Sequence, residues 1–305
     1  MEKQLRHSAF ILSLALAISG GCERNADQSG PRYATAPRGE GVHEYHVAIH
    51  PLHNPTRLSQ AYQPLLSYLS QHLSHCQFTL EASRDYSAFE QKVADRIPDL
   101  ILPNPWQALQ AMRRGYHVIA MAGDPSDFKG LWIVRKDGGI RSPTDLRGKT
   151  LCYPSPTALA ACIMPQYFLH QHGINVGVDV SNMYVGSQES SIMNVFLGTA
   201  AAGATWPPPW RAFQRDHPEE AGALQVIWET GSLINNAVMV RDDVPATIRD
   251  SVKTMLIHLH DSTEGRAILS GMETARFHDA SDDSYDVVRR FVARFERDVR
   301  KVVAR

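Results

Sequence analysis

From residue 45 onward, short apolar runs rich in β-prone residues alternate with longer stretches in which apolar residues recur at helical spacing. An apolar run of this kind predicts a strand, and the longer spaced pattern predicts a helix. The first series predicts strands at 45–49, 77–81, 99–102 and 117–121, and helices at 58–73, 86–96 and 106–114. Strands and helices in alternation are typical of an α/β fold with a mostly parallel sheet.

A second alternating series begins after residues 123–129. It predicts strands at 131–135, 149–153, 183–185, 202–205 and 224–228, and helices at 189–197 and 209–214. A last strand at 237–240 precedes a helix at about 246–269 and an amphipathic C-terminal helix with apolar residues from Val288 to Val302. We therefore expect two α/β lobes.

The stretch 149–173 reads as a strand, a turn at Pro154–Thr157 and a long helix whose apolar face runs from Leu159 to Leu169. Free backbone N–H groups and the helix dipole make such a helix start an anion site, and open α/β sheets bind ligands at these strand ends. Taken alone, the stretch fits an ordinary βα unit of a core better. His50 likewise follows the first strand at its carboxyl end, where a cleft residue would lie.

The N-terminus has the regions of an export signal. Lys3 and Arg6 precede an apolar run at 9–18 that is too short to span a bilayer comfortably, and small residues follow up to Cys22. This arrangement resembles a bacterial lipoprotein signal covering residues 1–21, in which Cys22 would be lipidated. Ser19 departs from that motif, which usually has a leucine-like residue there, so plain secretion is the alternative. Residues 22–44 are polar and rich in Gly and Pro, as expected for a tether.

Composition narrows the function classes. The 305 residues have a net charge of −1 with dispersed basic residues, which argues against nucleic acid as a partner. The sequence contains no GxSxG, HExxH, P-loop or GxGxxG motif, so we expect neither an enzyme nor a cofactor, and His and Cys spacing predicts no metal site. Cys76, Cys152 and Cys162 fit buried free thiols, while a Cys152–Cys162 disulfide stays open.

Several segments, in order and spacing, resemble the phosphate/phosphite/phosphonate-type periplasmic substrate-binding proteins of ABC transporters, a type II solute-binding family. The resemblance runs from about His46 to Phe291. It rests on the export signal, the two lobes and these segments: 64–69 (PLLSYL), Asp85-Tyr86, 99–101 (DLI), 145–150 (DLRGKT), 203–205 (GAT), Asn235-Asn236 and 264–266 (EGR).

The resemblance implies a two-lobed, periplasmic-binding-protein-like (type II) clamshell with a mixed, mostly parallel sheet in each lobe. Lobe 1 would comprise residues 45–127 and 235–305, and lobe 2 residues 128–234. The protein would be a monomer in the periplasm, lipid-anchored or soluble, that captures a small anionic ligand and hands it to an ABC membrane permease. The alternative is a sensor module that signals to a membrane receptor, since both use the same fold.

The chain departs from the family at the helix start of the stretch 149–173. Phosphonate-binding members have a Ser-Thr-Ser run there, and the matching positions are Ala158, Leu159 and Ala160. Ser155 and Thr157, just upstream, can replace part of the missing hydroxyl set. A family histidine at the start of the next helix falls at Ser187. These departures leave the identity of the ligand open.

The candidate ligand-binding residues follow from strand ends and from matched motifs. Trp106 and Trp206 would stack on a planar or apolar part of the ligand, although core packing is an equal alternative for each. Tyr86 and Thr157 would meet the ligand from opposite lobes. The full set is Tyr86, Asn104, Trp106, Ser155, Thr157, Ala158, Ser187, Gln188 and Trp206.

Overall fold

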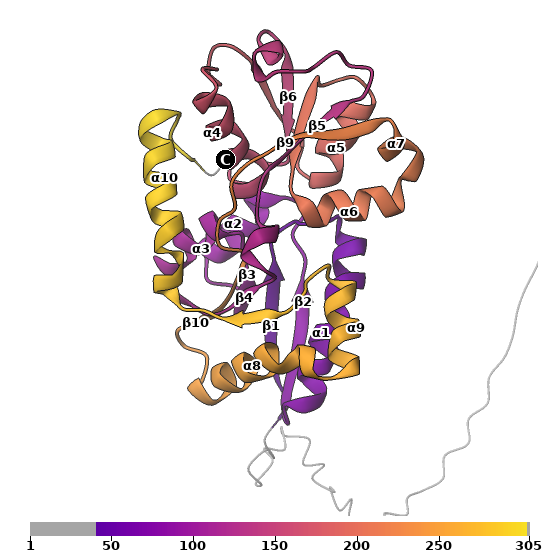
Figure 1. Ribbon diagram of the computed structural model, residues 1–305. Coiled ribbons are helices and arrows are strands. Elements are labelled where there is room, and N and C mark those ends of the chain that lie inside the picture. Colours follow the sequence, from indigo (N-terminus) through magenta and orange to yellow (C-terminus); the bar gives the residue numbers. More distant parts are fainter. Residues whose placement is uncertain (1–40, 304–305) are drawn as a thin grey trace, which may run out of the picture. The chain divides into compact units, whose positions relative to one another are not determined.

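A computed structural model describes residues 41–303, which contain two sheets flanked by helices (Figure 1). The first sheet has six strands in the order β11-β4-β10-β3-β1-β2, and the second has five in the order β7-β6-β8-β5-β9. The first comprises β1 (His43–Ile49), β2 (Cys76–Glu81), β3 (Leu100–Leu102), β4 (Tyr116–Ala122), β10 (Ala237–Arg241) and β11 (Phe277–Asp279). The second comprises β5 (Leu131–Arg135), β6 (Thr150–Tyr153), β7 (Ser181–Tyr184), β8 (Ala202–Thr205) and β9 (Leu224–Glu229).

Both sheets mix parallel and antiparallel pairs. Strand β1 pairs in parallel with β2 and β3, and β6 pairs in parallel with β7 and β8. The other described pairs, which involve β5, β10 and β11, are antiparallel. The predicted α/β fold with mixed sheets is confirmed, but mostly parallel pairing is wrong. The reason is that β5 and β10 enter their sheets from the other sheet's side, without the helical crossover that a parallel neighbour requires.

The helices lie between and around the strands. Those next to the first sheet are α1 (Pro55–His72), α2 (Tyr86–Ala94), α3 (Pro105–Met112), α8 (Ala246–His258), α9 (Thr263–Gly271) and α10 (Asp286–Asp298). Those next to the second are α4 (Met164–Gln171), α5 (Gln188–Phe196), α6 (Pro207–Asp216) and α7 (Pro218–Gly222), with a π-helical turn, Leu159–Ile163, leading into α4.

Side-chain caps start the helices that follow the parallel strands. The side chains of Asn54, Asp85 and Asn104 accept hydrogen bonds from the first-turn amides of α1, α2 and α3. A cap oxygen satisfies an amide that has no partner within the helix, and it fixes where the helix begins. These helices therefore begin at the carboxyl ends of β1, β2 and β3.

Two helix predictions need correction. The helix predicted at 246–269 is two helices, because Ser262 caps α9 and a side chain at Gly265 would place its Cβ only 1.7 Å from the Leu259 carbonyl oxygen. Helix α10 ends at Asp298, and the tail at 299–303 leaves it. The short elements β11 and α7 were not predicted, since neither is long enough to show a period.

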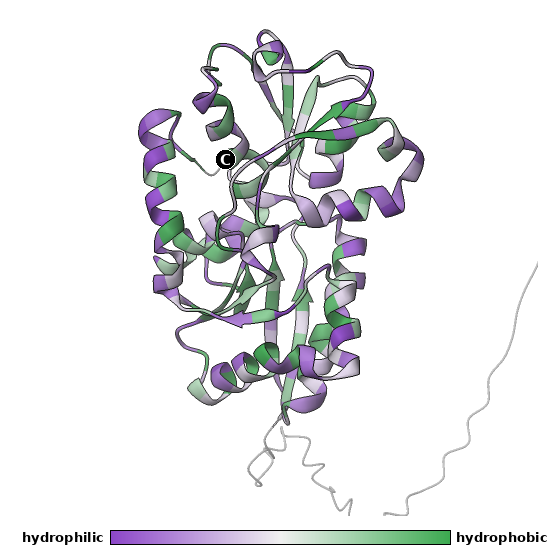
Figure 2. Ribbon diagram, in the orientation of Figure 1, coloured by the Kyte–Doolittle hydropathy of each residue, from purple (hydrophilic) through white to green (hydrophobic). Residues whose placement is uncertain are grey.

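Hydrophobic residues dominate the strands, and hydrophilic residues mark the outer faces of the helices (Figure 2). The predicted inner face after β6 is buried at Leu159, Cys162, Ile163, Gln166 and Leu169. One main hydrophobic cluster includes residues next to both sheets, and Trp210 belongs to a smaller second cluster. The two sheets are thus joined by apolar packing as well as by the chain.

The chain crosses between the sheets at 123–130 and 230–236. A further connection comes from the tail after α10, where Arg300 donates hydrogen bonds to the Gln166 side chain (2.8 Å) and the Pro156 carbonyl (3.0 Å). Residues from Gly41 on pack as one compact unit, so the predicted lobe limits stay a prediction. We use lobe 1 and lobe 2 below for the parts built on the first and second sheets.

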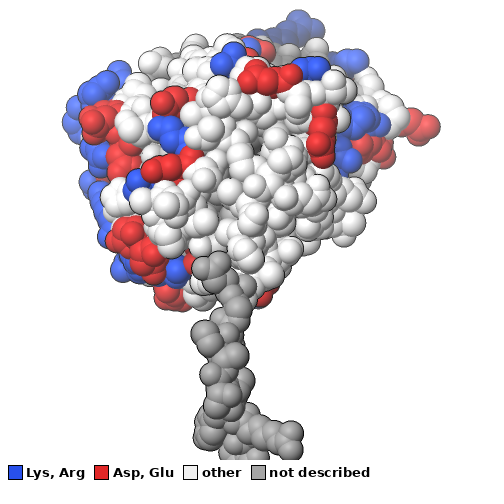
Figure 3. Space-filling model, turned by 90° about the horizontal axis from the view of Figure 1, so that it is seen from below, with Lys and Arg blue, Asp and Glu red and all other residues white. Residues whose placement is uncertain are grey.

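The predicted signal and Cys22 lie outside the described residues, as does most of the predicted tether, and β1 already begins at His43. Within residues 41–303, no helix has the length and apolar character needed to cross a membrane. The face in Figure 3 shows Lys and Arg interspersed with Asp and Glu rather than a continuous basic surface. Cys76, Cys152 and Cys162 are buried free thiols, so the open Cys152–Cys162 disulfide is absent.

Candidate functional site

The carboxyl ends of strands from both sheets meet around a small cavity of about 10 Å³. Lobe 1 contributes residues that follow β1 and β3 or begin α2, and lobe 2 contributes the π-helical turn and the start of α5. The lining residues are His50, Tyr86, Asn104, Phe128, Ala158, Leu159, Ala160, Ala161, Gln188, Trp206 and Asn236. A cavity of this size holds about one water molecule, so the lobes are closed on each other in this conformation.

Five of the nine predicted site residues line this cavity: Tyr86, Asn104, Ala158, Gln188 and Trp206. Ser155 and Thr157 are buried beside it, in the turn before the helix. Trp106 lies in the main hydrophobic cluster and borders a separate groove of about 500 Å³ formed by α2, α3 and Val302. Ser187 is the N-cap of α5, where its side chain accepts from the Ser190 amide at 3.1 Å.

Tyr86 and Gln188 contact each other directly across the cleft. The Tyr86 hydroxyl accepts a 3.1 Å hydrogen bond from Gln188 Nε2, and Gln188 Oε1 accepts one from the Thr205 hydroxyl at 3.0 Å. Burial raises the pKa of the Tyr86 phenol, so its hydroxyl keeps its proton. Because Gln188 is held by Thr205, the contact is a fixed meeting point between the lobes.

Thr157 forms a second interlobe contact. Its hydroxyl donates a 2.5 Å hydrogen bond to Oε1 of Glu90 in α2 and lies 2.8 Å from the Ser155 hydroxyl oxygen. Asn104 Nδ2 donates to the Thr157 carbonyl at 3.3 Å, and Gln107 Nε2 donates to Glu90 at 2.9 Å. Desolvation raises the Glu90 pKa despite these hydrogen bonds. In this conformation, the Thr157 hydroxyl is used between the lobes.

The lobe 2 wall offers backbone donors. The turn before α4 has the wide hydrogen bonding of a π-helix, with the Ile163 amide bonded to the Ala158 carbonyl at 3.1 Å. Within the described chain, the amides of Leu159, Ala160 and Ala161 donate no backbone hydrogen bond. Turns of this kind occur often at functional sites. Small side chains at Ala158 and Ala160 leave this backbone accessible from the cavity.

The lobe 1 wall contains two polar residues that were not among the predicted site residues. His50 Nδ1 lies 2.9 Å from the Leu102 carbonyl oxygen, and desolvation lowers the His50 pKa to about 4, so the ring is neutral at pH 7. Asn236 precedes β10, and its buried Oδ1 has no hydrogen-bond partner within the described chain. The sequence signal for His50 was its position after β1, and the signal for Asn236 was its place in the segment Asn235-Asn236 that resembles the family.

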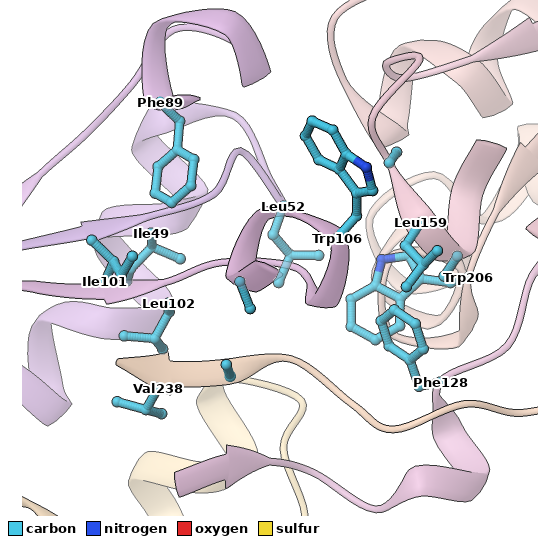
Figure 4. Packing of buried hydrophobic residues seen from close by; sticks show 14 of the residues in the cluster. Ile49, Leu52, Phe89, Ile101, Leu102, Trp106, Phe128, Leu159, Trp206 and Val238 are labelled. Carbon is cyan, nitrogen blue, oxygen red and sulfur yellow. The ribbon is translucent and has the colours of Figure 1, made fainter. Parts of the chain in front are cut away.

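Aromatic rings close another side of the cavity. The rings of Phe128 and Trp206 lie 5.5 Å apart between centroids, and Leu159 packs with them (Figure 4). Phe128 lies in the first crossing between the sheets and was not predicted, because a single aromatic residue in a loop has no periodic signal. Trp206, the N-cap of α6, belongs to the main hydrophobic cluster and also lines the cavity. Core packing and ligand contact, the two alternatives for this residue, therefore do not exclude each other.

A larger groove of about 560 Å³ lies beside the cavity and shares Gln188 with it. Residues of both lobes line it, and polar contacts join them: Asn54 Nδ2 donates to Glu189 at 3.3 Å, and Arg57 lies 3.9 Å from Asp216. The groove is polar and contains ionic side chains. The cavity wall, in contrast, includes no Lys, Arg, Asp or Glu. No group of His, Cys, Asp and Glu in the described chain is arranged to hold a metal ion.

Two α/β lobes, joined by two crossings and meeting at their strand ends, define the clamshell of the type II periplasmic binding proteins. Residues 47–285 match the family described as ABC transporter, phosphonate, periplasmic substrate-binding protein. The chain belongs to this family.

Solved structures share the fold. A binding protein component of an ABC phosphonate transporter from Pseudomonas aeruginosa superposes with a TM-score of 0.76, 17% identity and coverage of 84% of this chain and 87% of that one. PhnD1 from Prochlorococcus marinus, in complex with methylphosphonate, has a TM-score of 0.76, 19% identity and coverage of 83% and 98%. These relatives are transport binding proteins rather than enzymes.

A curated relative, the probable ABC transporter phosphite binding protein PhnD1 of Prochlorococcus marinus, is 23% identical over 181 residues. That alignment covers 55% of this chain and 61% of the relative.

Proposed function

We propose that this chain is a periplasmic solute-binding protein that captures a small anion between its lobes and delivers it to an ABC permease. The observation that carries the proposal is that both lobes contribute polar groups to one cavity. Lobe 2 presents the free amides of Leu159, Ala160 and Ala161, and lobe 1 meets it through Tyr86 and Asn104. Backbone amides at a helix start are favourable anion donors. Groups contributed by both lobes allow a ligand to shift the balance between open and closed forms.

The cavity also restricts the ligand. It has room for about one water molecule, so even a phosphite-sized ion requires the lobes to move apart from this conformation. Donors in the wall are uncharged, which favours an ion of low charge over a highly charged one. The relative PhnD1, described as a probable phosphite binding protein and solved in complex with methylphosphonate, supports a small oxyanion. The ligands we propose are therefore phosphonate-like or related small oxyanions.

Binding can be tested on the mature chain with Cys22→Ser, which avoids the lipid. Thermal unfolding and titration calorimetry with phosphite, phosphate, methylphosphonate and methanesulfonate should reveal at least one anion that raises the melting temperature and binds stoichiometrically. Tyr86→Ala should weaken that binding by about 1–3 kcal/mol. Failure of all four anions would refute the proposed ligand class.

Delivery to a permease is a separate part of the proposal. We expect the liganded protein to stimulate ATP hydrolysis by its cognate permease in proteoliposomes. A sensor module would bind the same anion without that stimulation, so the experiment separates the two functions. We also propose that Cys22 carries a lipid anchor. The Cys22→Ser chain should then leave the membrane fraction, whereas a Cys76→Ser control should stay in it.

A further inference from the structure

The two walls of the cavity differ in hydrogen-bonding character. The lobe 2 wall contributes N–H donors from residues 159–161, and the Tyr86 hydroxyl adds one proton from lobe 1. The lobe 1 wall contributes His50 and Asn236, which both line the cavity. An anion needs donors, and the first wall supplies them. The lobe 1 wall needs a separate explanation because, besides the Tyr86 hydroxyl and the Asn236 amide N–H groups, it presents acceptors that no donor of the described chain reaches.

His50 is an acceptor for a geometric reason. A carbonyl oxygen can only accept, so the 2.9 Å contact between His50 Nδ1 and the Leu102 carbonyl requires the proton to be on Nδ1. Burial keeps the ring neutral, with a pKa of about 4, since only 3% of His50 is exposed. The remaining ring nitrogen, Nε2, is then a lone-pair acceptor. Nε2 forms no hydrogen bond within the described chain.

Asn236 adds the second acceptor. Only 7% of the residue is exposed, and its Oδ1 is buried without a donor in the described part of the chain. Its neighbour Asn235 is fully used, since Asn235 Nδ2 donates to the Asp124 carbonyl and Asn235 Oδ1 accepts from the Asn236 amide. A buried acceptor without a donor is unfavourable, and a ligand that carries a proton to it removes that penalty.

We propose that the cleft selects an oxyanion that still carries one proton, such as a hydrogen phosphonate or hydrogen phosphite monoanion. This inference rests on the proposed function. The charged oxygens would accept from the amides of residues 159–161 and from Tyr86, while the acidic O–H would donate to His50 Nε2 or Asn236 Oδ1. A sulfonate has no proton to donate, and a fully ionised phosphonate has lost it. Each would place a negative oxygen against the lone pair of His50 Nε2, which has no proton to donate, and is therefore disfavoured.

The residues that line the cavity should not change charge across the neutral range. Glu90, whose pKa burial raises, contacts Thr157 beside the cavity, so the pH profile is measured in Glu90→Gln as well, where only the ligand titrates. Burial raises the pKa values of Tyr62 and Tyr86, and burial together with Arg57 lowers that of His53 to about 4. The acids that line the adjoining part of the cleft, Asp127 and Glu273, are both paired with Arg211. We therefore expect a pH profile that follows the second ionisation of the ligand, which for a phosphoryl group lies at about pH 6 or higher.

The test is calorimetry with methylphosphonate, phosphite and methanesulfonate from below to well above the second pKa of each phosphorus acid. Methylphosphonate affinity should fall about tenfold per pH unit above its second pKa, because the fraction of monoanion falls by that factor. Methanesulfonate should bind at least about tenfold more weakly at every pH. Asn236→Leu and His50→Leu, which remove the acceptors, should reduce this discrimination. His50→Gln should retain it, since Gln Oε1 offers an acceptor in a similar place.

Asn54→Ala, in the larger groove beside the cavity, is the matched control. It should discriminate between methylphosphonate and methanesulfonate as the unmodified chain does. Thermal unfolding of each variant separates lost folding from lost recognition, and Asn236→Leu keeps the test valid where His50→Leu destabilises the fold. Equal affinity for methanesulfonate, or pH-independent methylphosphonate binding, would overturn the inference and leave the proposed function standing. No binding of these three anions or of phosphate would overturn both.

Discussion

The hydroxyl of Tyr86 in α2 accepts a 3.1 Å hydrogen bond from the side chain of Gln188 at the start of α5, so the two lobes meet at the centre of the cleft. Both side chains are buried, and Thr205 holds the Gln188 amide from behind. A ligand that enters this cavity has to replace or share this contact. The balance between open and closed lobes therefore depends on the same atoms that would bind the ligand.

Tyr86→Phe removes this contact with little change in shape. We expect the open form to gain population, because a neutral buried hydrogen bond is worth about 0.5–1.5 kcal/mol. Solution scattering without added ligand should show a larger radius of gyration for the variant. Tyr68→Phe, on α1 and away from the cavity, is the control and should scatter like the unmodified chain. An unchanged radius for Tyr86→Phe would mean that other contacts alone set closure.

Glu90 couples the second interlobe contact to pH. Desolvation raises its pKa above the ordinary 4.5, so the folded chain binds the Glu90 proton more tightly than the unfolded chain does. The stabilising effect is complete below the unfolded pKa and is lost as the pH rises through the raised value. Glu90→Gln should therefore remove a stability decrease that begins near about pH 4.5. Urea unfolding from acid to neutral pH should show the flatter profile.

The control for Glu90 is Glu81→Gln, since Glu81 pairs with Lys92 on the same lobe but does not contact lobe 2. Only the difference between the two variants is then assigned to the interlobe contact. Identical profiles for Glu90→Gln and the unmodified chain would show that burial of this carboxylate has no net effect on folding.

Arg300 connects the C-terminal tail to the turn and helix that follow β6 in lobe 2. Its guanidinium donates to Pro156 and Gln166 of lobe 2 and lies 5.3 Å from the centroid of the Phe295 ring in α10. Arg300→Ala should release the tail and increase amide hydrogen exchange in residues 156–163, because hydrogen bonds to a charged group are worth about 1.5–3 kcal/mol. Arg297→Ala is matched, since Arg297 is bonded to Asp298 on the same helix. Equal exchange in the two variants would contradict a restraining role for the tail.

The sequence predicted most strands and helices because elements of ordinary length show their period. It also placed Tyr86, Asn104 and Gln188 at one cleft, since each lies where a helix begins beside a strand end, and all three line the cavity. His50 and Asn236 were harder to assign, because their role depends on a backbone carbonyl from β3 and on burial, and neither is visible in local sequence. For Trp106, core packing and ligand contact were equal alternatives, and the structure places this residue in the main hydrophobic cluster and outside the cavity wall.

The helix start after β6 offers the most direct test of how this chain differs from its family. By the sequence resemblance, Ala158 and Ala160 fall at places where phosphonate-binding members have serine, and both line the cavity. Ala160→Ser adds one hydroxyl that can donate to a bound oxyanion. A charge-assisted hydrogen bond is worth about 1.5–3 kcal/mol, so methylphosphonate affinity should rise by about tenfold to a hundredfold.

The cavity is small, so even one added oxygen overpacks the closed form and offsets part of the gain in methylphosphonate affinity. Ala161→Ser is the matched control, since it adds the same atom next to the family's serine positions, and it should change affinity much less. Calorimetry with methylphosphonate compares the two variants at one pH. Equal affinities would show that the missing hydroxyls do not limit phosphonate binding and that the backbone amides of this turn supply most of the recognition.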